Sequence, residues 1–106
     1  MGTIGLIREA YGDGYPNLAD CISSAPIENK GKVLMYLKRA PVVGAAAGRA
    51  VDYMTGKRIP QEFLFYDDGE FNWRSDTIYF FEKYNLRLPD AFIKKAISNI
   101  ANVMKS

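Results

Sequence analysis

Histidine is absent from this chain of 106 residues, and cysteine occurs once, as Cys21. Without histidine, a single chain cannot build a Ser-His-Asp triad, a Cys-His pair or a histidine-based metal site. Without a second cysteine it cannot form an intrachain disulfide, which is typical of proteins from the reducing cytosol. We therefore expect a cytoplasmic protein that is not an enzyme and that uses no cofactor or metal ion.

Long hydrophobic runs are also missing. The longest apolar-rich stretches cover residues 40–47 and 78–81, whereas a membrane-spanning helix needs about 20 apolar residues. Residues 1–10 contain Arg8 and Glu9 within their apolar stretch, which is unlike a secretory signal. With 48% hydrophobic and 25% charged residues, the composition predicts a single globular domain, residues 1–106, without contact to a membrane.

Neither sign of charge dominates the chain. Its 14 basic and 12 acidic side chains give a formal net charge of +2, too close to balance to indicate strong attraction to nucleic acid or anionic lipid. The distribution is uneven, because segment 30–58 holds seven basic residues and one acid, and segment 62–76 holds five acids and one base. Both segments can simply be solvent-exposed faces of the protein. Alternatively, they form separate basic and acidic regions of the surface, one of which binds a partner of opposite charge.

Helical and β-prone segments follow one another in an order that predicts an α+β fold. The expected elements are helices over residues 4–11, 16–22 and 26–40, β-prone runs at 42–43 and 50–54, a hairpin of 63–66 with 70–73, and helices over 75–84 and from 89 onward. The hairpin is the strongest local signal, because Asp67-Asp68-Gly69 separates two aromatic runs and glycine supplies a positive φ.

The C-terminal part has clear helix signals. Ser75 is expected to cap a helix whose first turn contains Asp76, where the helix dipole favours an anion. The last helix has an apolar stripe made of Phe92, Ile93, Ala96, Ile97, Ile100 and Met104. We therefore predict three N-terminal helices, a small antiparallel sheet with a tight hairpin, and two C-terminal helices packed on one face of the sheet.

Three groups of residues suggest chemistry, and each has a simpler structural interpretation. Segment 44–49 resembles a phosphate-binding loop but lacks the Gly-Lys-Ser/Thr ending. Asp67, Asp68 and Glu70 are possible ligands for Mg²⁺ or Ca²⁺, although turn chemistry explains the Asp-Asp-Gly sequence. Asp52 lies in an apolar run, either as a buried acid–base carboxylate or as the exposed residue of a half-buried strand. The sequence leaves these two interpretations of Asp52 open.

Aromatic residues beside acids favour a protein-binding surface around the hairpin. The predicted contact set consists of Asp67, Asp68, Glu70, Trp73 and Asp76, with Tyr66 or Tyr79 adding apolar area. Stacking on nucleic-acid bases is the competing use of such aromatics, but it needs adjacent Lys or Arg to bind phosphate. Since segment 62–76 offers mostly carboxylates, we favour a protein partner.

Four short segments of the chain resemble known proteins: Tyr36-Leu37-Lys38, Asp52 with Thr55-Gly56, residues 66–73 (YDDGEFNW) and residues 84–92 (YNLRLPDAF). In these segments the chain resembles small bacterial proteins of the toxin-immunity type, including the immunity proteins of contact-dependent growth inhibition. The resemblance spans residues 30–93, and its motifs are structural rather than catalytic.

The resemblance implies a cytosolic inhibitor that binds one toxin domain, such as a nuclease, and covers its active site. It implies no particular site residues, because such interfaces differ between toxin–inhibitor pairs. The net charge of +2 departs from the acidic balance expected of an inhibitor that mimics RNA toward a basic nuclease. The acidic segment 62–76 reduces this disagreement but does not remove it.

Two other functions remain open from the sequence. A nucleic-acid-binding or regulatory module would use the basic segment 30–58, and its binding would weaken steeply with salt. A small enzyme would use carboxylates and a metal ion at Asp67, Asp68 or Asp52.

Overall fold

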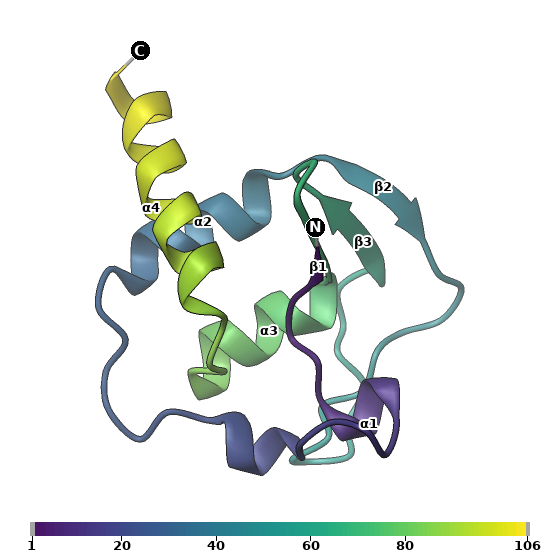
Figure 1. The fold of residues 1–106 in the computed structure, drawn as a ribbon. Coiled ribbons are helices and arrows are strands. Elements are labelled where there is room, and N and C mark those ends of the chain that lie inside the picture. Colours follow the sequence, from purple (N-terminus) through teal and green to yellow (C-terminus); the bar gives the residue numbers. More distant parts are fainter. Residues whose placement is uncertain (1, 106) are drawn as a thin grey trace.

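The computed structural model describes the backbone of residues 2–105 and the side chains of residues 2–100 (Figure 1). Its elements are β1 (Gly2–Thr3), α1 (Arg8–Tyr11), the 3₁₀ turn η1 (Leu18–Cys21), α2 (Lys30–Arg39), β2 (Val42–Ala45), β3 (Leu64–Asp67), β4 (Phe71–Arg74), α3 (Ser75–Tyr84) and α4 (Asp90–Lys105). The strands form one sheet in the order β1-β4-β3-β2. The predicted α+β class is confirmed.

The hairpin of β3 and β4 forms around Asp67-Asp68-Gly69, as predicted. Gly69 has a φ of +98°, a conformation that glycine adopts without steric cost. The Asp68 carboxylate accepts hydrogen bonds from the amides of Glu70 at 2.8 Å and Phe71 at 2.6 Å. These bonds use the donors of the turn itself, and local chemistry therefore fixes the register of the two strands.

The sheet is mixed, because its two outer strands pair differently. β2 lies antiparallel to β3, with an irregularity between Val42 and Gly44. β1 lies parallel to β4 and pairs Gly2 with Phe71. The expected antiparallel arrangement therefore holds for β2, β3 and β4, and β1 adds a parallel strand.

Helices α2, α3 and α4 lie on one side of the sheet (Figure 1). The side chain of Trp73 on β4 is 1% exposed and anchors this layer. Its ring centroid lies 5.2 Å from that of Phe92 on α4 and 6.2 Å from that of Tyr36 on α2. Its indole N–H donates to the carbonyl oxygen of Leu37 at 3.3 Å. The core thus forms where both helices meet the hairpin, and the expected packing of the C-terminal helices is observed.

Three local predictions about the N-terminal half were wrong. Within residues 4–11 only α1 is helical, because Gly5 has a φ of +75° and cannot continue a helix. The third helix begins at Lys30 rather than near residue 26, since Asn29 adopts a left-handed conformation. Residues 50–54 form no strand: Val51 makes one isolated bridge with Arg58, and a turn follows at residues 53–55.

The predicted cap at Ser75 is also wrong, because Arg74 is the N-cap residue of α3. The Ser75 hydroxyl instead donates to the carbonyl oxygen of Glu62 at 3.1 Å and accepts from the amide of Leu64 at 3.0 Å. The start of the last helix was predicted correctly. Its apolar stripe is buried at Phe92, Ala96 and Ile100, and the side chain of Met104 lies outside the described residues.

Within residues 2–105, no helix is long and apolar enough to cross a membrane.

Candidate functional site

Asp52 is a buried carboxylate, 1% exposed, that joins the segment after β2 to α3. Its Oδ2 accepts hydrogen bonds from the hydroxyls of Tyr79 at 2.7 Å and Tyr84 at 2.6 Å. Its Oδ1 accepts from the amides of Met54 at 2.9 Å and Thr55 at 3.3 Å. Burial alone would raise the pKa of this carboxyl, but the two hydroxyls and two amides outweigh burial and hold the pKa below its usual value. Asp52 is therefore ionised and fully occupied by internal donors.

Lys83 covers this network from the solvent side. Its Nζ donates to the hydroxyl of Tyr79 at 3.0 Å and lies 3.6 Å from Oδ2 of Asp52. The same ammonium lies 5.4 Å from the ring centroid of Tyr79 and 5.5 Å from that of Tyr84. The hydrogen bond with Tyr79 raises the pKa of Lys83. The Tyr79 hydroxyl therefore has two partners, Asp52 and Lys83, which restrain the orientation of the Tyr79 ring.

Asp68 holds the hairpin against the helices. Besides the two turn amides, its carboxylate accepts from the hydroxyl of Tyr36 at 2.6 Å and lies 3.2 Å from Nζ of Lys95. Burial would raise its pKa, but the amides, Tyr36 and Lys95 outweigh burial and lower the pKa. The side chain of Asp68 is 4% exposed, which makes it a structural link between β4, α2 and α4.

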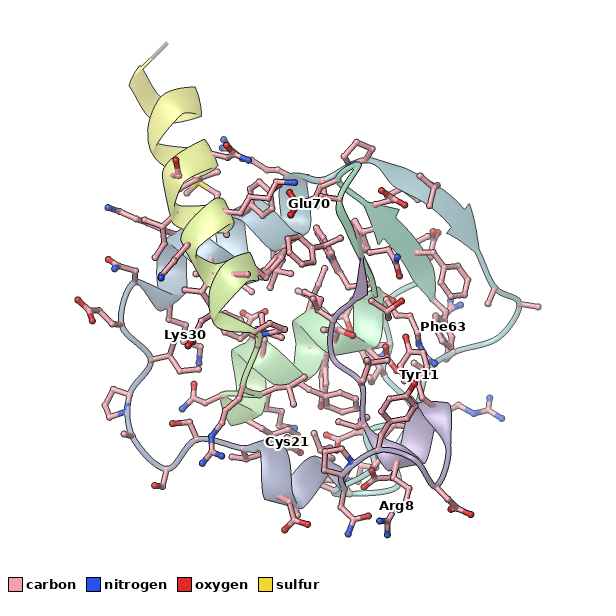
Figure 2. The ribbon with its side chains drawn as sticks, in the orientation of Figure 1. Arg8, Tyr11, Cys21, Lys30, Phe63 and Glu70 are labelled. Atoms are coloured by element: carbon pink, nitrogen blue, oxygen red, sulfur yellow. The ribbon has the colours of Figure 1, made fainter. Side chains whose placement is uncertain are left out.

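Asp76 forms a buried ion pair with Arg74. The guanidinium donates two bonds to the carboxylate, from Nε at 3.1 Å and from an Nη at 2.6 Å. Arg74 also lies 4.7 Å from the ring centroid of Phe63 and 5.4 Å from that of Tyr11, two residues that are close together in Figure 2. Burial raises the pKa of Asp76, and Arg74 opposes this shift without cancelling it. The pair lies at the junction of β4 and α3, and Arg74 contacts the N-terminal segment at Tyr11.

The structure separates the residues that sequence reasoning grouped as one contact surface. The prediction was wrong for Trp73 and Asp76, which are 1% and 3% exposed and cannot contact a partner while buried. Asp68 is also covered, because its oxygens are used by internal donors. Of the rest, Glu70 is exposed beside α4 (Figure 2), where it pairs with Lys95 at 3.1 Å. The remaining three residues, Tyr66, Asp67 and Tyr79, are half-buried.

Tyr66 and Tyr79 share a groove, which we call the α3–β3 groove. It has a volume of about 490 Å³ and is lined by Lys38, Ile59, Gln61, Glu62, Leu64, Tyr66, Ser75, Ile78, Tyr79 and Glu82. Asp67 does not line this groove but borders a smaller hollow with Thr3 and Asn72. The groove thus combines an apolar floor with two tyrosines, two glutamates and Lys38, a mixture of apolar and polar groups that suits recognition.

Sequence reasoning missed most of this groove. Segment 59–62 and Glu82 were outside the predicted set, because only the folded chain brings the end of a long loop next to α3. One signal was available: Ser75, Ile78, Tyr79 and Glu82 recur at the i, i+3, i+4 and i+7 spacing of one helix face.

The sequence also suggested a metal site near the hairpin and a nucleic-acid surface in segment 30–58, and the structure describes both regions. No group of three or more Cys, Asp or Glu side chains that could hold a metal ion occurs among the described side chains. The ammonium of Lys95 lies between Asp68 and Glu70, where a bound cation would have to lie. The basic residues of segment 30–58 are divided between α2 and the connection from β2 to β3, and Lys30 and Lys38 are engaged by the end of α3.

No family model, curated protein or solved structure matches the chain.

Proposed function

We propose that this chain is a non-enzymatic immunity protein that acts in the cytoplasm, where it binds a cognate bacterial toxin domain, such as a nuclease, and covers its active site. The proposal rests on the resemblance of residues 30–93 to such proteins and on the chemistry that the surface offers.

One observation carries the proposal: three buried carboxylates and two accessible carboxylates have different surroundings. Asp52, Asp68 and Asp76 are buried and held by internal hydroxyls, amides and cations, so that their oxygens are not offered to a substrate. Glu62 and Glu82 are instead accessible and lie beside half-buried tyrosines. Accessible acids and aromatics together suit protein recognition better than acid–base chemistry.

In this proposal, inhibition is steric and electrostatic. Aromatic and aliphatic side chains that become buried on binding supply most of the affinity, because a few central residues dominate interface energies. The accessible carboxylates raise the rate of encounter with a basic toxin surface, and this contribution falls as salt is added.

The test begins with capture of the tagged full-length chain from its native host, with and without nuclease treatment, followed by mass spectrometry. The captured toxin domain is then expressed in a test bacterium with and without this chain. We expect one stoichiometric toxin fragment that survives nuclease treatment, and restored growth when both proteins are present.

Two outcomes would overturn the proposal. If nuclease abolishes capture and nucleic acid is recovered, the basic segment 30–58 becomes the functional surface. If a toxin fragment is captured but co-expression does not restore growth, the chain is not its inhibitor.

A further inference from the structure

We propose that the α3–β3 groove is the docking site for an extended segment of the toxin that places one Arg or Lys side chain between apolar residues. This inference rests on the proposed function, and it names the surface and the chemistry of the partner segment.

The walls of the groove come from two regular stripes. Ser75, Ile78, Tyr79 and Glu82 form one face of α3. Leu64 and Tyr66 are alternate residues of β3 and point to the same face of the sheet. Helices α2 and α4 cover this face over Trp73 on β4, whereas Leu64 and Tyr66 on β3 are only half-buried. The groove is therefore an uncovered continuation of the core, where apolar side chains of a partner gain burial.

The groove is held in shape before any partner arrives. The Tyr79 hydroxyl is fixed by Asp52 at 2.7 Å and by Lys83 at 3.0 Å. Ser75, also on α3, holds the opposite wall, because its hydroxyl donates to the carbonyl oxygen of Glu62 and accepts from the amide of Leu64. Because both walls are tethered to α3, binding loses little conformational freedom in this protein.

Charge determines the choice of partner segment. Glu62 and Glu82 line the groove, and no ion pair of Glu62 occurs among residues 2–100. Glu82 pairs with Lys38 at 3.3 Å, but both side chains are about half exposed, at 53% and 52%. An exposed pair of this kind contributes only about 0–1 kcal/mol, so an incoming cation can replace Lys38.

The two tyrosines strengthen the preference for a cation. An Arg or Lys that reaches the carboxylates lies beside the ring of Tyr66 or Tyr79, where a cation–π contact on a free ring face is favourable, as Lys83 already shows for Tyr79 at 5.4 Å. A phosphate group would instead meet two carboxylates and only one ammonium, that of Lys38, among the groove's lining residues, which disfavours nucleic acid there. The apolar floor of Ile59, Leu64 and Ile78 accommodates the residues on either side of the cation.

The first experiment uses the tripeptide acetyl-Leu-Arg-Leu-amide as the probe, and acetyl-Leu-Glu-Leu-amide as its charge control. Each is titrated into the ¹⁵N-labelled full chain, and backbone amide shifts are followed by NMR. We expect saturable shifts at Glu62, Leu64 and Tyr79 with the arginine peptide, and at least fivefold weaker binding of the glutamate peptide. Equal binding of both peptides, or shifts confined to another surface, would overturn the inference.

A matched pair of variants makes the test specific. Glu62→Lys reverses a charge in the groove, and Asp13→Lys makes the same change at an exposed residue that does not line it. We expect Glu62→Lys to weaken binding of the arginine peptide about tenfold, and Asp13→Lys to change it less than twofold, with both variants melting like the unmodified chain. Comparable weakening by both variants would reduce the effect to overall charge and contradict a groove-specific site.

The same variants separate this inference from the proposed function. If the unmodified chain binds its toxin and Glu62→Lys binds equally well, the groove is not the docking site although the inhibitor proposal stands. If the arginine peptide binds in the groove but no toxin is captured, the groove is a peptide site and the inhibitor proposal fails.

Discussion

Replacing Asp52 by alanine tests whether the buried carboxylate network stabilises the fold. The substitution removes the acceptor of four hydrogen bonds, two of them from the hydroxyls of Tyr79 and Tyr84. A hydrogen bond to a charged group contributes about 1.5–3 kcal/mol, but water can replace the carboxylate at the half-buried hydroxyls. We therefore expect a loss of about 3 kcal/mol rather than the sum of four bonds, which for a domain of this size lowers Tm by about 12–24 °C.

Urea unfolding at pH 7 measures this loss directly. The chain has a single tryptophan, Trp73, which is 1% exposed, so its fluorescence reports unfolding of the core. The control is Asp13→Ala, which removes an exposed carboxyl and should change the free energy of unfolding by no more than about 0.5 kcal/mol.

A double-mutant cycle then assigns the loss to the network. Tyr84→Phe alone should cost about 1.5 kcal/mol, because Asp52 keeps its other three donors. In the Asp52→Ala background the same change should cost close to nothing, which gives a coupling energy of about 1.5 kcal/mol. If Asp52→Ala stays within about 0.5 kcal/mol of the unmodified chain, or Tyr84→Phe costs the same in both backgrounds, the reasoning is refuted.

The network also predicts a pH dependence with a defined sign. The pKa of Asp52 is held below its usual value, so the folded state binds this proton less readily than the unfolded state. Its stabilising effect is complete above the unfolded pKa of about 3.9 and is lost as the pH falls through the lower folded value. The free energy of unfolding should therefore fall less steeply for Asp52→Asn than for the unmodified chain between pH 5 and pH 2. Parallel curves would show that Asp52 contributes nothing to the acid response.

Two further substitutions test local geometry, with urea unfolding as the measurement. Gly5→Ala should cost about 2–4 kcal/mol, because a Cβ there would lie 2.6 Å from Thr77 in addition to the strain of φ +75°. Gly56 has the same φ of +75° with open space around it, so Gly56→Ala should cost only about 1 kcal/mol. Equal losses of stability in the two variants would show that the clash with Thr77 adds nothing. Arg74→Met leaves the carboxylate of Asp76 buried without its partner and should cost about 3–5 kcal/mol, and a loss below about 1 kcal/mol would contradict the importance of the ion pair.

The sequence predicted those elements that local chemistry determines. The hairpin follows from Asp67-Asp68-Gly69, whose side chains and φ angles serve the turn itself. The end of α3 also depends on local chemistry, since Asn85 adopts the left-handed conformation that is typical of a residue after a helix.

Elements that depend on distant partners were not predictable in the same way. β1 exists only because residue 2 reaches residue 71, and a two-residue strand has no pattern of its own. Asp52 was noted as a polar residue in an apolar run, but its burial depends on hydroxyls 27 and 32 positions away. A first-turn aspartate such as Asp76 is normally solvated, and here Arg74 and the core enclose it.

In the candidate site, too, some features follow from local sequence and others depend on distant parts of the chain. Tyr66 and Tyr79 were predicted as aromatic contact residues, and they line the α3–β3 groove. Trp73 was assigned to the surface because strand alternation tells which residues share a face but not which face the helices cover. The glutamates of the groove come from different elements, and no short-range pattern connects them.

The position of β1 has a consequence for synthesis of the protein on the ribosome. The amides of Gly2 and Ile4 bond to the carbonyl oxygens of Glu70 and Asn72, both at 3.0 Å, and Ile4 and Ile7 are buried in the core. When residues 2–7 leave the ribosome, the strand that must receive them has not been translated. Their apolar side chains therefore remain exposed to solvent, where chaperones can bind them, until the hairpin has been synthesised. Residues 2–7 are thus translated before β4 but can reach their folded positions only after it.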